Sequence, residues 1–90
     1  MAVLLVTYDL RQPGRDYAPV HDYLKQFAHC KDLESAWLID TKLSTVQVRD
    51  ALMQRIDSND DKIFVVSLIR EWAAYGHGCA DWLNSLDRTW

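Results

Sequence analysis

The sequence predicts an α+β domain in which helices cover one mostly antiparallel sheet. Two runs rich in β-branched and apolar residues, 3–10 and 62–69, have the length of buried strands. Segments with helical spacing alternate with them. Of the 90 residues, 49% are hydrophobic and 26% are charged, which is typical of a globular protein. This length favours a single domain over residues 1–90.

The first strand and helix are separated by a turn. The run at 3–10 ends before a loop at 11–15 that contains Pro13-Gly14. Asp16 can cap a helix, and Pro19 falls in its first turn, where a missing N–H is tolerated. The apolar residues with helical spacing are Tyr17, Val20, Leu24, Phe27 and Ala28.

The next extended stretch covers residues 31–41. It is either one long bent strand or a short hairpin whose first arm lies near residues 30–33. The sequence leaves both open.

The clearest helix begins after Ser44. Ser44 and Gln47 have the spacing of a capping box, and Leu43 and Val48 that of a hydrophobic staple. A polar turn at 57–61 ends this region. The predicted buried stripe is Val48, Ala51, Leu52 and Ile56.

After the strand at 62–69, residues 70–78 are expected to be irregular or to form a short edge strand. Residues 79–86 are predicted to form a short closing helix with Trp82, Leu83 and Leu86 on one side. This order predicts a ferredoxin-like two-layer sandwich, with a β-α-β-β-α-β core and an extra C-terminal helix.

Both faces of the two long strands are apolar, which predicts a homodimer formed through the sheet. Val3 and Leu5 point to one face of the first strand, and Leu4 and Val6 point to the other. A sheet with one face in water should alternate apolar and polar residues. Large exposed apolar patches are unusual in monomers, so a second copy is the simplest cover. The alternative is that the closing helix covers this face within one chain.

Cysteine usage and hydropathy favour a soluble cytoplasmic protein. Cys30 and Cys79 lack CxxC spacing, and we expect two unrelated thiols and no disulfide staple. The apolar run 2–6 lacks the features of a targeting segment, and no stretch is long enough to span a membrane. The formal charge of −3 disfavours a non-specific nucleic-acid binder.

An ordered series of short motifs carries a family resemblance over about residues 3–72. The motifs are Tyr8-Asp9 at the first strand end, Ser35-Ala36-Trp37-Leu38, the Leu43-Ser44 helix start, and an apolar strand after Asp60-Asp61. In these the chain resembles the CRISPR-associated Cas-two superfamily, which includes the VapD proteins. The loop RQPGRDY and Trp72-Ala73-Ala74 look most like its stand-alone SinR-like branch.

The resemblance implies a ferredoxin-like homodimer with a nucleic-acid-related role, either a metal-dependent nuclease acting on RNA or DNA or a non-catalytic dimeric scaffold. The family's metal-site aspartate falls on Asp9, and its strand serine falls on Ser35. Where the family's first helix carries basic residues, this chain has Val20-His21-Asp22. That difference counts against cleavage.

The residues themselves allow a metal site at Asp9. In a two-fold dimer Asp9 could approach its symmetry mate, and paired carboxylates with water suit Mg²⁺. We expect the first and third strands to be parallel neighbours, which would bring Asp40 near Asp9. The alternative is that Asp9 caps a turn or pairs with Arg11 or Arg15.

Several other side chains are candidates for binding substrate. Tyr8, Arg11 and Arg15 could hold a phosphodiester, although such arginines more often form a solvated loop. Ser35 could donate a hydrogen bond, although a lone strand serine is usually only packed. The histidines His21, His29 and His77 lack metal-ligand spacing, and we expect them on the surface or in turns. The tryptophans Trp72, Trp82 and Trp90 could stack bases, but packing of the closing helix is the more common use.

Overall fold

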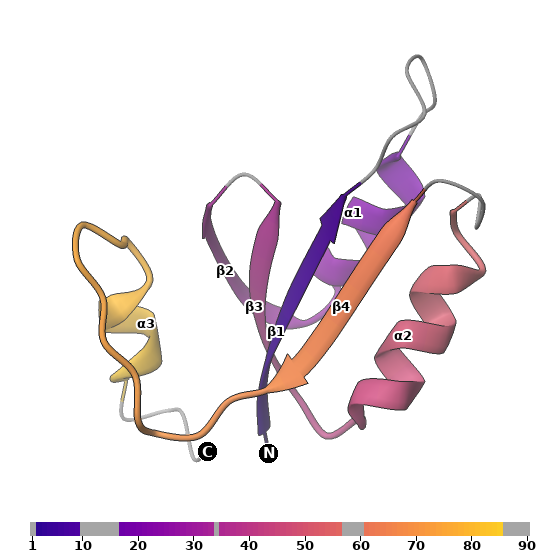
Figure 1. The fold of residues 1–90 in the computed structure, drawn as a ribbon. Helices are drawn as coiled ribbons and strands as arrows, with labels where there is room; N and C mark the ends of the chain where they lie inside the picture. Colours follow the sequence, from indigo (N-terminus) through magenta and orange to yellow (C-terminus); the bar gives the residue numbers. More distant parts are fainter. Residues whose placement is uncertain (1, 10–16, 34, 57–60, 86–90) are drawn as a thin grey trace.

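A computed structural model describes residues 2–9, 17–33, 35–56 and 61–85, and shows a small α+β fold (Figure 1). Within these residues the elements are, in order, β1 (Ala2–Asp9), α1 (Ala18–Lys25), β2 (Ala28–Leu33), β3 (Ala36–Thr41), α2 (Thr45–Met53), β4 (Lys62–Ser67) and α3 (Ala80–Leu83).

The four strands form one sheet in the order β2-β3-β1-β4, and each neighbouring pair is antiparallel. Although β1 comes first in the chain, it lies inside the sheet between β3 and β4. Leu5 of β1 stands opposite Leu38 of β3 and Val66 of β4. For residues 31–41, the hairpin is the alternative that the structure confirms, because β2 pairs with β3.

The first helix is shorter than its apolar spacing predicted. The N-cap position is Tyr17, with no capping hydrogen bond from its side chain, and Asp16 lies outside the described residues. The helix ends at Lys25, and Ala28 is already the first residue of β2. Two turns are enough to bury Val20 and Leu24 against the sheet, so the chain can leave the helix there.

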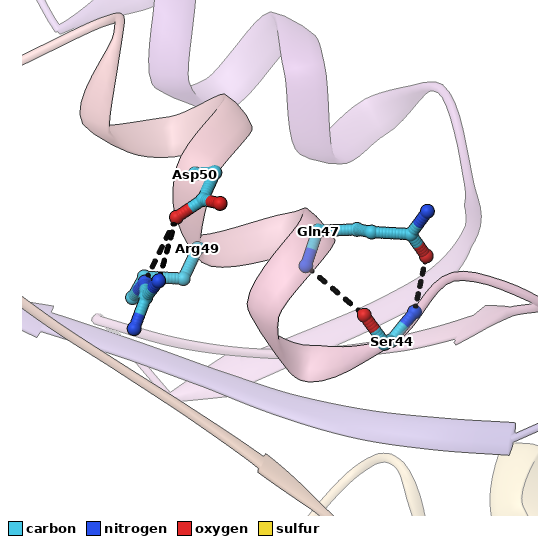
Figure 2. Close-up of polar contacts among 4 residues, drawn as sticks. All are labelled: Ser44, Gln47, Arg49 and Asp50. Carbon is cyan, nitrogen blue, oxygen red and sulfur yellow. Dashed lines mark hydrogen bonds and ion pairs between the residues drawn. The ribbon is translucent and has the colours of Figure 1, made fainter.

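The predicted capping box at the start of α2 is confirmed (Figure 2). The backbone N–H of Gln47 donates to Ser44 Oγ at 3.1 Å, and the Ser44 N–H donates to Gln47 Oε1 at 2.9 Å. These two bonds satisfy backbone donors that have no partner inside the helix. One turn later, Arg49 and Asp50 form an exposed ion pair at 2.8 Å.

The last two elements are also shorter than predicted. β4 ends at Ser67, and α3 covers only four residues. Before α3, His77 Nδ1 accepts a hydrogen bond from the Cys79 N–H at 3.0 Å, so His77 shapes the entry to the helix.

α1 and α2 cover one face of the sheet and form the main core (Figure 1). The sheet contributes alternate residues of β1 and β3, as the two-residue period of a strand requires. The buried members of this core are Leu4, Val6, Val20, Tyr23, Leu24, Trp37, Ile39, Val48 and Leu52.

α3 lies on the opposite face and covers part of it (Figure 1). Val3 and Leu38 are buried there beneath Cys79 and Leu83. The closing helix therefore covers the second apolar face over β3 and the neighbouring part of β1. This is the alternative to a dimer that the sequence left open.

A disulfide joins Cys30 of β2 to Cys79, with the two Cα atoms 5.9 Å apart. The expectation of two unrelated thiols was therefore wrong. Spacing along the chain says nothing about a pair separated by 49 residues, which only the tertiary fold brings together.

The β1/β4 part of the same face is only partly covered, with Leu5, Thr7 and Val66 half-buried. Phe64 is 63% exposed, although it lies in the middle of β4. Thr7 stands opposite Phe64, and Leu5 opposite Val66, so these side chains continue the apolar surface toward the sheet edge. We call Leu5, Thr7, Phe64 and Val66 the open half-face.

None of the helices in the described ranges is long and apolar enough to cross a membrane.

Candidate functional site

Asp9 is the last residue of β1, and it is exposed. Its cross-strand neighbour is Lys62, the first residue of β4. Directly opposed residues share one face of a sheet, and side chains alternate along each strand. Asp9 and Lys62 therefore project on the same side as Thr7 and Phe64, at the end of the open half-face.

A shallow hollow of about 380 Å³ lies at this end of the sheet. It is formed where β1 ends and β4 begins. The residues that line it are Thr7, Tyr8, Asp9, Lys62, Ile63 and Phe64. A carboxylate and an ammonium group thus flank an otherwise mainly apolar surface.

Tyr8 neighbours Asp9 in the chain, but its hydroxyl is engaged on the helix-covered side. Trp37 Nε1 donates a hydrogen bond to Tyr8 Oη at 3.0 Å, and His21 Nε2 lies 3.3 Å from the same oxygen. Tyr8 is thus part of a polar network among α1, β1 and β3. This use of its hydroxyl competes with the predicted contact to a phosphodiester.

Ser35 is exposed in the turn between β2 and β3. Its carbonyl accepts a hydrogen bond from the Tyr8 N–H at 3.2 Å, which fixes this turn beside the end of β1. The structure therefore brings Ser35, Tyr8 and Asp9 to the same end of the sheet. Arg11 and Arg15 lie outside the described residues.

Asp40 lies far from Asp9, which corrects the expectation that the two aspartates are neighbours. β1 and β3 are antiparallel, and Asp40 stands opposite Val3 rather than near the end of β1. Asp9 lies six positions beyond Val3 along β1, a span of about 20 Å at roughly 3.3 Å per residue. In the split β-α-β arrangement β3 lies between β1 and β2 and runs against both. The expected parallel pairing was therefore wrong.

Two histidines form a cluster with Trp37 that the sequence analysis missed. The ring centroids of His21 and His29 lie 6.0 Å and 5.3 Å from that of Trp37. His29 Nδ1 lies 2.8 Å from the Phe27 carbonyl, which accepts its hydrogen bond, and Lys31 Nζ lies 5.9 Å from the Trp37 ring centroid. Spacing within one helix could not reveal this cluster, because His21 is on α1 and His29 is on β2.

The residues that the structure describes contain no group of three or more histidine, cysteine, aspartate or glutamate side chains able to hold a metal ion. Cys79 is in a disulfide, so His77 and Cys79 are not a ligand pair. Mg²⁺ is commonly held by one or two carboxylates, with water completing its coordination. One protomer offers Asp9 at the candidate site, and a two-fold dimer would offer two such carboxylates.

Comparison with known proteins yielded no significant match to a protein-family model or to a solved structure.

Proposed function

We propose that this protein is a ferredoxin-like homodimer related to the Cas-two superfamily, and that it acts on nucleic acid as a metal-dependent nuclease. The β-α-β-β-α-β order and the strand order β2-β3-β1-β4 support the fold. The observation that carries the activity is the exposed carboxylate of Asp9 at the end of β1, beside the open half-face.

The dimer is proposed to form through the open half-face and the neighbouring edge of the sheet. Phe64 is exposed in the middle of β4, where a second copy would remove it from water. α3 covers the β2/β3 part of this same face. The two sheets of a dimer would therefore meet over β1 and β4 rather than over their full width. Asp9 stands at the end of this region, so a two-fold axis nearby would bring it toward the partner's Asp9.

In this dimer the two Asp9 carboxylates would hold Mg²⁺. The bound metal would polarise a phosphodiester oxygen and lower the pKa of a coordinated water. Arg11 and Arg15 are proposed to bind the phosphate, and the exposed Ser35 to position the substrate from the adjacent turn. Tyr8 is proposed to position Asp9 through its network with Trp37 and His21.

A non-catalytic dimeric scaffold is the second candidate. The formal charge of −3 and the sequence Val20-His21-Asp22 on the first helix favour it. A chain with this charge would neutralise few phosphates, so it would bind nucleic acid weakly and cleave it inefficiently. For either role we propose a cytoplasmic location. Cellular dithiols there would reach and reduce the Cys30–Cys79 disulfide.

Cleavage assays with Asp9→Ala distinguish the two candidates. Purified protein is incubated with labelled RNA and labelled duplex DNA in Mg²⁺, in Mn²⁺ and in chelator. We expect cleavage that chelator abolishes and that Asp9→Ala lowers by at least about 100-fold, because loss of even an outer-shell partner of a metal ligand costs roughly 10–100-fold. The matched control is Asp50→Ala, which removes an exposed carboxylate from α2 and should retain activity.

Cleavage that persists unchanged in Asp9→Ala would remove this residue from the mechanism. Binding of either nucleic acid without cleavage in any metal would support the scaffold.

A further inference from the structure

We propose that the Cys30–Cys79 disulfide is a redox-sensitive latch. In the oxidised protein it holds residues 68–85, here called the C-terminal segment, over the β2/β3 side of the sheet. When the bond is reduced, the segment can leave the sheet while the rest of the fold stays intact.

The C-terminal segment is packed lightly for a part of the chain that covers a core. Only Cys79 and Leu83 are buried in it, while Trp72 and Trp82 are partly buried. Tyr75 is fully exposed. Its one regular element is the four-residue α3, which is too short to be stable without tertiary restraint. The covalent bond is therefore a large share of what fixes this segment in place.

The segment can open without disturbing the main core. It begins at Leu68, whose N–H donates to the Val3 carbonyl at 2.9 Å and so continues the pairing of β4 with β1. Beyond that point the chain leaves the sheet edge and crosses to α3 (Figure 1). The core beneath α1 and α2 lies on the other face and uses a separate set of side chains.

The two sulfur atoms differ in accessibility, and this difference determines which of them an external thiol attacks first. Cys79 is 0% exposed, whereas Cys30 is partly exposed on β2. A thiolate of an external dithiol would attack Cys30 Sγ and form a mixed disulfide. The Cys30–Cys79 bond breaks, and its electron pair leaves with Cys79 Sγ, which takes up a proton. The second thiol of the dithiol then releases Cys30, and the products are two protein thiols and one oxidised dithiol.

Opening would uncover Val3 and Leu38, and it would expose more of Leu5, which lies opposite Leu38 and already belongs to the open half-face. These residues adjoin Val66 and the rest of the open half-face. Reduction would thus convert a half-covered apolar surface into a continuous one. The latch does not depend on the proposed nuclease activity or on dimer formation.

Hydrogen–deuterium exchange on the full chain tests the latch, with the oxidised protein compared to protein in excess dithiothreitol. We expect amides of residues 71–85 to exchange at least about tenfold faster after reduction, as for a local opening. The exchange rates of amides in α1, α2 and β1 should change less than about twofold, because these elements lie outside the segment that opens. Re-oxidation should restore the slow exchange.

Unchanged exchange in residues 71–85 would overturn the proposal, because packing alone would then hold the segment. A similar increase throughout the chain would also overturn it, because the disulfide would then secure the whole fold. The control is Cys30→Ser combined with Cys79→Ser, which should resemble the reduced protein and ignore dithiothreitol. If that variant does not fold, reduced wild-type protein blocked by alkylation of both thiols provides the same comparison.

Discussion

Breaking the Cys30–Cys79 bond should lower the free energy of unfolding by an amount that follows from the chain length it encloses. The two cysteines are 49 residues apart. In the chain-entropy description, a cross-link over a loop of this size removes about 14 cal/mol/K from the unfolded chain, or about 4 kcal/mol at 298 K. This value applies if the folded protein is the same before and after reduction.

The latch makes the expected loss smaller. Suppose that opened molecules outnumber closed ones about tenfold in the reduced native protein. These additional conformations then stabilise the native ensemble by about 1.4 kcal/mol. The net loss on reduction should then be about 3 kcal/mol, the difference between these two contributions.

Urea unfolding followed by far-UV circular dichroism measures the free energy of unfolding in the oxidised and reduced protein. A loss of about 3 kcal/mol would agree with a released segment. A loss below about 1 kcal/mol would refute the reasoning, because the cross-link would then restrict the unfolded chain far less than its length requires.

Two further substitutions test the proposed dimer surface and the helix start. Phe64→Asp should convert the proposed dimer to a monomer in sedimentation at micromolar concentration, because it puts a charge at the centre of the open half-face. The control Tyr75→Asp changes a fully exposed aromatic residue elsewhere and should leave the proposed dimer intact. A wild-type monomer under these conditions would contradict the interface. Ser44→Ala should cost about 1 kcal/mol and lower Tm by about 4–8 °C, because it removes the Oγ acceptor of the capping box. Loss of the Gln47 side chain in the same background should then add little, and a fully additive effect would show that the two bonds act separately.

Local chemistry was predictable wherever the residues concerned are close in sequence. The capping box depends on residues three apart, and its geometry is confirmed at Ser44 and Gln47. The alternation along β1 likewise predicted that Leu4 and Leu5 lie on opposite faces of the sheet, and they pack into different clusters. The lengths of α1 and α3 were less predictable, because tertiary packing decides where a short helix ends.

The features that the sequence did not predict depend on contacts between distant segments. The disulfide joins β2 to the start of α3, and no spacing rule identifies such a pair. The same is true of the cluster around Trp37, whose two histidines come from different elements. For the candidate site, the position of Asp9 at an exposed strand end was predictable, whereas its separation from Asp40 required the direction of β3.

The position of β1 also has a consequence for how the chain is made. This first strand needs hydrogen-bonding partners on both sides, and they come from β3 and from β4. A growing polypeptide therefore carries an unsatisfied, strongly apolar strand until Ser67 has emerged from the ribosome. Chains that depend on such long-range pairing fold slowly and are prone to aggregate meanwhile. Expression at reduced temperature or with chaperones should accordingly raise the soluble yield.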